Sequence, residues 1–282
     1  MKNALEVRNL TKKYSGFTLD HVNITLPTGC IMGFIGENGA GKSTTIKLLL
    51  DLIHRDGGTV SVLGEDHISA NKRIKEQIGV VMDESGFPEN LTLGNISAIM
   101  GNCYRSWDNN MFSRYAAQFE LPDRKPLKDY SRGMKMKLSI AVALSHGSRL
   151  LILDEATSGL DPIIRDEILD VFLEFIQDES HSIFISSHII SDLEKICDYI
   201  TFIHKGKIVF SEAKDELLEK YVILKSSQAA YDAMDKKAVI GVRKNRFGVE
   251  ALALRNGVSP GMTTDAATIE EIMLYFVKEA VK

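Results

Sequence analysis

The chain has 282 residues, of which 44% are hydrophobic, and a formal net charge of −4 at pH 7. This length allows one large domain and a small second one, and the weakly negative charge excludes a broad basic surface for nucleic-acid phosphates, so no nucleic-acid partner is expected. The three cysteines, Cys30, Cys103 and Cys197, lie far apart and fit no metal or redox spacing. We interpret them as reduced core thiols of a cytosolic protein.

No segment of the sequence predicts export or a membrane crossing. Charged residues interrupt the apolar ones from Lys2 onward, unlike an ordinary signal peptide. The longest apolar runs, such as 140–144 and 150–153, are far shorter than the ~18 residues that a membrane span requires. If the protein acts at a membrane, we expect another chain to hold it there.

The N-terminal part predicts several strands around one helix. Residues 4–10 and 17–26 alternate or run apolar with β-branched residues, and a further strand is expected over 30–35. A glycine-rich turn follows, then a helix with apolar spacing over 44–52 and a strand over 59–63. The order strand, glycine-rich turn, helix is the one in which phosphate-binding loops occur.

Residues 90–128 predict a helical insert, part of a helical subdomain over about 90–145. Asp108 is a plausible N-cap for a helix in this insert. The apolar face of that helix is formed by Met111, Phe112, Tyr115 and Phe119.

A parallel α/β core is predicted after the insert. A strand over 150–153, a helix over 162–177, a strand over 182–186 and a helix through Cys197 alternate along the chain. This alternation is typical of a doubly wound sheet with parallel strands. We place the large domain at residues 1–210.

Residues 211–282 predict a small α+β appendix. It is expected to hold helices near 213–220 and 228–235, a strand over 221–224 and a hairpin around 245–248. Its last helix is predicted by a capping-box spacing and an apolar stripe, formed by Thr268, Glu271, Ile269, Ile272, Met273 and Phe276.

The sequence GENGAGKS over residues 36–43 matches the phosphate-binding P-loop pattern. It follows an apolar strand and opens a helix, as that pattern requires. In such loops glycines turn backbone N–H groups toward phosphate oxygens, a lysine neutralises their charge and a hydroxyl ligates Mg²⁺. The candidate nucleotide-binding residues are Gly36, Asn38, Gly39, Ala40, Gly41, Lys42, Ser43 and Thr44.

Two acids end the apolar strand that begins at residue 150. Asp154 and Glu155 are expected at the carboxyl edge of a parallel sheet, where open α/β folds bind ligands. Asp154 and Ser43 are therefore candidate Mg²⁺ ligands, and Glu155 is a candidate to orient and polarise the attacking water.

The order of these motifs resembles the nucleotide-binding subunit of ABC transporters, and the resemblance covers nearly all of residues 4–210. Tyr14 stands where that family has the aromatic residue that stacks on adenine. Residues 130–134, YSRGM, stand in the place of the signature loop. The D-loop corresponds to Ser158, Gly159, Leu160 and Asp161, and the switch histidine to His188.

The resemblance implies a dimer in which each subunit completes the site of the other. The signature residues Ser131, Arg132, Gly133 and Met134 would hold the γ-phosphate of ATP bound to a second copy or to a sister ATPase subunit. His188 would contact the γ-phosphate as a catalytic residue together with Glu155. Taken alone, Ser131 fits an ordinary helix N-cap and His188 an ordinary polar residue.

The chain departs from the family pattern at three positions. Arg132 replaces the usual signature glycine and Met134 a glutamine, and Asp83 stands where the Q-loop glutamine is expected. A carboxylate there is a further candidate Mg²⁺ contact, but it adds negative charge beside the triphosphate.

The sequence therefore predicts an α/β fold: a P-loop NTPase cassette with an N-terminal antiparallel β subdomain, a helical insert and a C-terminal appendix. The resemblance implies an ATP- and Mg²⁺-dependent ATPase that drives a membrane-spanning subunit on a separate chain, at the inner face of the cell membrane. The departures look most like bacterial drug, bacteriocin or antimicrobial-peptide exporters. A soluble ABC ATPase outside transport, a regulatory subunit with weak hydrolysis, and import in place of export stay open as alternatives.

Overall fold

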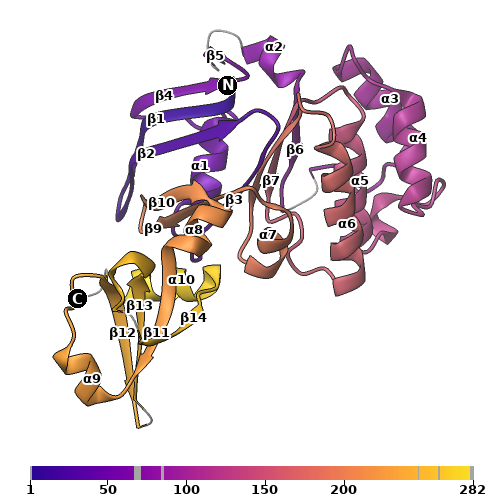
Figure 1. The fold of residues 1–282 in the computed structure, drawn as a ribbon. Coiled ribbons are helices and arrows are strands. Elements are labelled where there is room, and N and C mark those ends of the chain that lie inside the picture. Colours follow the sequence, from indigo (N-terminus) through magenta and orange to yellow (C-terminus); the bar gives the residue numbers. More distant parts are fainter. Residues whose placement is uncertain (1, 67–70, 84–85, 247, 260, 280–282) are drawn as a thin grey trace. The chain divides into compact units, whose positions relative to one another are not determined.

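The computed structural model describes residues 2–66, 71–83, 86–246, 248–259 and 261–279. The chain divides into two compact units, Met1–Ile208 and Val209–Lys282. The course of the chain through each unit is shown in Figure 1.

An antiparallel sheet in the order β2-β1-β4-β5 forms the first part of the large unit. Its strands are β1 (Asn3–Tyr14), β2 (Phe17–Pro27), β4 (Gly57–Val62) and β5 (Glu65–Asp66). β1 and β2 form a hairpin in which Tyr14 pairs with Phe17. This sheet is the predicted N-terminal β subdomain.

A second sheet, in the order β10-β9-β3-β8-β7-β6, forms the centre of the large unit. Its strands are β3 (Ile31–Ile35), β6 (Ile78–Val81), β7 (Leu150–Asp154), β8 (Ser182–Ser186), β9 (Tyr199–His204) and β10 (Lys207–Ala213). All residues of β3, β7 and β8 are buried, which explains their continuous apolar sequences. The pairs from β6 through β7, β8 and β3 to β9 are parallel, so their carboxyl ends share one edge.

Helix α1 (Lys42–Leu49) is fixed by a core that spans both sheets. Ile46 of the helix, Leu5 of the antiparallel sheet and Phe34 of the central sheet are each fully buried in this core. Burying a side chain of this kind stabilises the fold by roughly 1.5–3 kcal/mol. The core therefore holds the start of α1 against the carboxyl end of β3.

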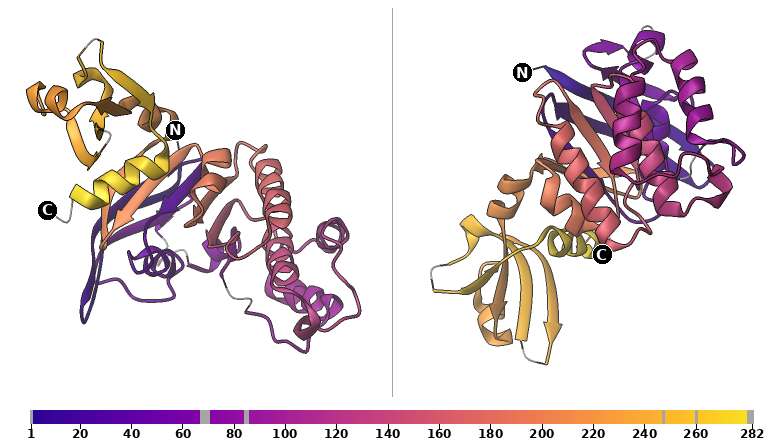
Figure 2. Two further views of the ribbon diagram at one scale, coloured as in Figure 1. Left: turned by 90° about the horizontal axis from the view of Figure 1, so that it is seen from below. Right: turned by 90° about the vertical axis from the view of Figure 1, so that its right-hand side faces the viewer.

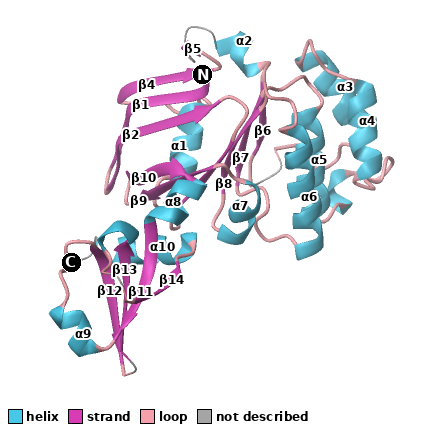
Figure 3. Ribbon diagram, viewed as in Figure 1, coloured by secondary structure: helices cyan, strands magenta, loops and turns pink. Residues whose placement is uncertain are grey.

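The remaining helices of the large unit lie outside the two sheets and are cyan in Figure 3. They are α2 (Asn71–Lys75), α3 (Leu93–Cys103), α4 (Asn109–Gln118), η1 (Leu127–Asp129), α5 (Arg132–Leu144), α6 (Pro162–Phe175) and α7 (Ile190–Ile196). Both views of Figure 2 place α3 and α4 beside α5. These three helices form the helical subdomain predicted over about 90–145.

The insert is less helical than predicted, although the Asp108 cap is confirmed. The Asp108 carboxylate accepts hydrogen bonds from the backbone N–H groups of Asn110 and Met111. Helix α4, however, ends at Gln118, and residues 121–126 lie outside any helix. Pro122 and Pro126 explain the difference, because proline cannot donate the helical hydrogen bond and restricts the residue before it.

The small unit is built on a four-stranded antiparallel sheet in the order β12-β13-β11-β14. Its elements are α8 (Lys214–Lys220), β11 (Tyr221–Ser226), α9 (Gln228–Ala233), β12 (Val239–Asn245), β13 (Gly248–Leu254), η2 (Arg255–Gly257), β14 (Thr263–Ala266) and α10 (Ile269–Glu279). Asn245 pairs with Gly248, which confirms the predicted hairpin, while Phe247 in its turn lies outside the described residues. The capping box is also confirmed, since Thr268 and Glu271 exchange hydrogen bonds.

The prediction that all three cysteines are core thiols is wrong for Cys103. Cys197 is buried and Cys30 half-buried, and burial raises the pKa of the Cys30 thiol above its ordinary value. Cys103 is exposed at the end of α3. An apolar residue type in an amphipathic helix does not reveal which face it occupies unless the helical period is clear.

Among the described residues, no helix combines the length and the apolar composition that crossing a membrane requires.

Burial of a histidine at the end of α5 predicts a pH-dependent stability. His146 is 1% exposed and its ring stacks on Tyr104 at 4.0 Å between centroids. Desolvation lowers the pKa of His146 below its ordinary value. The unfolded chain therefore binds a proton more readily than the folded one, so the free energy of unfolding falls as the pH drops below about 6.5.

We expect the melting temperature of the protein to fall between pH 7.5 and pH 5.5, and to fall less in a His146→Gln variant. Thermal unfolding followed by circular dichroism at both pH values measures this difference. Equal losses in the two proteins would show that His146 does not carry the pH dependence.

Candidate functional site

The P-loop turns between β3 and α1 in a backbone conformation that glycine permits. Gly39 and Gly41 have φ values of 81° and 114°. Gly36 needs its small size for a different reason: a Cβ atom there would lie 2.5 Å from the Ile203 carbonyl oxygen. The loop thus delivers the N-terminus of α1, with its unpaired N–H groups and positive dipole end, to the edge of the sheet.

A pocket of about 390 Å³ opens beside this loop and gathers residues from distant segments. It is lined by Phe17, Glu37, Asn38, Gly39, Gly41, Lys42, Ser43, Thr44, Asp83, Glu155, Ser158 and His188. Most of the predicted P-loop residues and both predicted catalytic residues therefore face one space. Gly36 and Ala40 do not line the pocket, and Ala40 is only 4% exposed.

Lys42 is held rigidly under the loop. Its side chain is 7% exposed, and its Nζ donates a hydrogen bond of 2.8 Å to the carbonyl oxygen of Gly36. The same Nζ lies 3.5 Å from Oε1 of Glu155. A cation fixed in this way is placed to neutralise phosphate charge without losing side-chain entropy on binding.

Glu155 connects the P-loop lysine to the predicted switch histidine. Its Oε2 lies 2.7 Å from Nδ1 of His188 and accepts the His188 backbone N–H at 3.3 Å. The φ of Glu155 is 54°, in the left-handed region that costs a residue other than glycine roughly 1–3 kcal/mol. This conformation lets the carboxylate leave the strand direction and reach into the pocket.

Asp154, the residue before it, is buried and oriented by β8. Its Oδ1 accepts a hydrogen bond of 2.6 Å from the hydroxyl of Ser186, and that hydroxyl in turn accepts the backbone N–H of Glu155. Ser186 therefore fixes both acids at the carboxyl ends of β7 and β8. The sequence offered no signal for this role beyond the position of Ser186 at the end of a strand.

The oxygen donors suit Mg²⁺ shared with a nucleotide. Ser43 is exposed and lines the pocket, whereas Asp154 is buried at the end of β7 and does not line it. No cluster of three or more His, Cys, Asp or Glu side chains that could hold a metal occurs in the described part of the chain. Mg²⁺ is usually bound by one or two protein oxygens together with phosphates and water, so this donor set fits.

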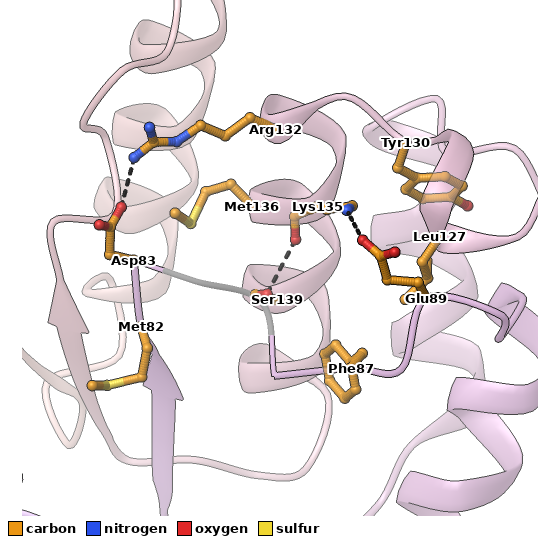
Figure 4. Close-up of a pocket in the computed structure, with 10 residues that line it drawn as sticks. All are labelled: Met82, Asp83, Phe87, Glu89, Leu127, Tyr130, Arg132, Lys135, Met136 and Ser139. Atoms are coloured by element: carbon orange, nitrogen blue, oxygen red, sulfur yellow. Dashed lines mark hydrogen bonds and ion pairs between the residues drawn. The ribbon is translucent and has the colours of Figure 1, made fainter.

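The four predicted signature residues do not line the pocket of their own chain. Ser131 is the N-cap of α5 and its Oγ accepts the backbone N–H of Met134 at 3.2 Å. Ser131 and Arg132 are exposed, while Gly133 is buried against Ile164 of α6. The guanidinium of Arg132 reaches Asp83 instead, as Figure 4 shows.

The predicted D-loop divides between the pocket and the start of α6. Ser158 lines the pocket. Asp161 is the N-cap of α6 and accepts the backbone N–H groups of Ile163 and Ile164, each at 3.1 Å. Gly159 and Leu160 bridge the two, and Gly159 has a φ of 68°.

Two aromatic residues at the β1–β2 turn are candidates to contact a base. Tyr14, the predicted one, is 46% exposed and has Nζ of Lys12 5.7 Å from its ring centroid, but it does not line the pocket. Phe17 does line it and packs on the P-loop, where a Cβ at Gly41 would lie 3.0 Å from Phe17 Cζ. Phe17 was not predicted as a base contact from the sequence, although it is aromatic and follows the same turn.

Comparison with known proteins shows the family of the chain. The family model for ABC transporters matches residues 19–158. The chain is 38% identical over 225 residues to a bacitracin transport ATP-binding protein of Bacillus licheniformis, covering 78% of this chain and 73% of that protein. It is 35% identical over 213 residues to a lantibiotic transport ATP-binding protein of Streptococcus pyogenes, covering 75% and 91%.

A solved structure of an ATP-binding subunit of an ABC transporter matches the fold with a TM-score of 0.69 and 27% identity. The match covers 76% of this chain and 91% of that one. This chain therefore belongs to the ABC transporter family, as one of its ATP-binding subunits.

Proposed function

We propose that the P-loop pocket binds Mg·ATP and that Glu155 and His188 carry its hydrolysis. The observation that supports this most directly is the chain of contacts from Lys42 through Glu155 to His188, which places a cation, a carboxylate and an imidazole around one space. Lys42 and the N-terminus of α1 would hold the β- and γ-phosphates. Ser43 and Asp154 would hold Mg²⁺, which neutralises the charge on the phosphates.

Each residue then has a defined part in the reaction. The Glu155 carboxylate accepts a hydrogen bond from the attacking water and raises its nucleophilicity. His188 is oriented by the hydrogen bond that its Nδ1–H donates to Glu155, and when the ring carries a second proton its Nε2–H donates to the γ-phosphate. The chain couples this hydrolysis to transport, as ATP-binding subunits of the family do.

We also propose that the signature residues act on the nucleotide of a second subunit. Ser131 and Arg132 are exposed at the start of α5 and lie outside the pocket of their own chain. A helix N-terminus with an exposed hydroxyl is suited to bind a phosphate. Two subunits facing each other would therefore complete two sites, so that hydrolysis belongs to the dimer.

We propose that the membrane partner is a separate chain, because the relatives named above are transport ATP-binding proteins. We propose that this partner holds the subunit at the inner face of the cell membrane. Two relatives are transport proteins for bacitracin and for a lantibiotic, which are peptide antibiotics, so we propose export of a peptide of this kind.

Purification from the native cells in mild detergent tests this proposal. We expect the tagged chain to carry with it one multi-span membrane protein in stoichiometric amount, identified by mass spectrometry. We further expect a peptide antibiotic to stimulate ATP hydrolysis by the reconstituted complex more than a small-molecule drug does. Ribosomal or DNA-associated partners without a membrane protein would overturn the transport role, and stimulation by drugs alone would overturn the peptide.

A further inference from the structure

Two residues that depart from the family pattern contact each other. Nη2 of Arg132 donates a hydrogen bond of 2.6 Å to Oδ1 of Asp83, across 49 residues of sequence. Both side chains are about half-exposed, at 53% and 52%. Figure 4 shows the guanidinium reaching from the first turn of α5 to the residue that follows β6 and Met82.

Asp83 stands between two pockets, whereas Arg132 lines only one of them. Asp83 lines the P-loop pocket together with Lys42 and Glu155. It also lines a neighbouring pocket of about 460 Å³, which includes Arg132 and Lys135. Arg132 therefore contacts the Asp83 carboxylate without lining the P-loop pocket itself.

The carboxyl ends of β6 and β7 bring three acids to one edge of the sheet. Glu155 is offset by Lys42, and Asp154 accepts the hydroxyl of Ser186. The guanidinium of Arg132 offsets the negative charge of Asp83. A carboxylate without such a cation would repel the phosphates of a nucleotide in the adjoining pocket.

The D-loop leaves room for this arrangement. A Cβ atom at Gly159 would lie 2.8 Å from Nη1 of Arg132, so the guanidinium passes directly over a residue without a side chain. Arg132 is thus half-exposed, pairs with Asp83 and lies close to Gly159. The three segments expected to form the Q-loop, signature and D-loop meet at one side chain.

We propose that Arg132 is a positioning residue for the nucleotide site of its own chain. It holds the Asp83 carboxylate toward itself and offsets its charge, so that an acid is tolerated where an amide is usual. This role is additional to any contact that the signature makes with a second subunit. It rests on the proposed function, because it requires the nucleotide in the P-loop pocket.

A double-mutant cycle with Mg·ADP tests this proposal, because ADP lacks the γ-phosphate that a second subunit would contact. We expect Arg132→Ala to raise the Kd of Mg·ADP about threefold to fivefold by calorimetry at low ionic strength, the effect typical of an exposed ion pair. Arg132→Lys keeps the charge and should restore most of the affinity. In an Asp83→Asn background, Arg132→Ala should leave the Kd unchanged.

Lys135→Ala is the matched control for this cycle. Lys135 lies on the same helix, lines the same neighbouring pocket and pairs with Glu89 at 3.1 Å, but it does not line the nucleotide pocket. Its loss should not change the Kd of Mg·ADP. An equal effect of Arg132→Ala in both backgrounds, or no effect with Asp83 present, would overturn the proposal.

Lys42→Ala in the same assay tests the nucleotide site separately from the role of Arg132. If the wild type binds Mg·ADP and Lys42→Ala does not, the nucleotide site is supported. The double-mutant cycle then tests only the role of the Asp83–Arg132 pair. If Lys42→Ala binds as tightly as the wild type, the proposed site is wrong, and the role of Arg132 fails with it.

Discussion

Replacing Glu155 with glutamine should lower the rate of ATP hydrolysis by about 10²–10⁴ while ATP binding persists. The amide keeps the size of the side chain and an oxygen that can accept the His188 backbone N–H, but it cannot act as a base toward water. Hydrolysis is then blocked after ATP has bound. We therefore expect the variant to accumulate as a closed dimer with Mg·ATP, measured by light scattering.

Glu120→Gln is a control that matches this change in both chemistry and backbone. Glu120 has a φ of 53°, close to the 54° of Glu155, and lies outside the nucleotide pocket. It should hydrolyse ATP at the wild-type rate. A Glu155→Gln protein that stays monomeric at saturating Mg·ATP would count against a homodimeric cycle, and one that keeps full turnover would remove Glu155 from catalysis.

Lys42→Ala should weaken ATP binding by about 100-fold or more, which corresponds to about 2.7 kcal/mol. The substitution removes the only lysine among the described residues that line the pocket, and charge-assisted hydrogen bonds to phosphate are of this strength. It also leaves the Glu155 carboxylate without its cation, 3.5 Å away in the wild type. Calorimetry with Mg·ATP measures the change.

Lys47→Ala provides the comparison on the same helix. Lys47 lies in the last turn of α1, is exposed and does not line the pocket, so its loss removes the same charge without touching the site. Its ATP affinity should equal that of the wild type. Unchanged affinity in Lys42→Ala as well would show that the P-loop assignment is wrong.

Local features of this protein could be predicted from the sequence because their causes are local. The Asp108 cap and the Thr268–Glu271 box each involve residues within three positions of one another, and both are confirmed. The buried strand ending at Asp154 was visible because a fully buried parallel strand has an uninterrupted apolar sequence. The P-loop was visible because its glycines have a fixed steric purpose.

Contacts across long separations could not be read in this way. Phe17 and Tyr14 are both aromatic and adjacent to one turn, and only the packing of β2 against the P-loop shows that Phe17 reaches the pocket. The exposure of Cys103 depends on which face of α3 the rest of the insert covers. Both depend on tertiary packing rather than on residue type.

The sequence by itself therefore determined the α/β class, the glycine-rich loop between β3 and α1 and the acids at the end of β7, because sterics and hydrophobic periodicity act over a few residues. Only the tertiary structure decided that Glu155 contacts both Lys42 and His188, and that Asp83 forms an ion pair with Arg132. Electrostatic partners are chosen by distance in space, and the parallel order of β6, β7 and β8 sets those distances.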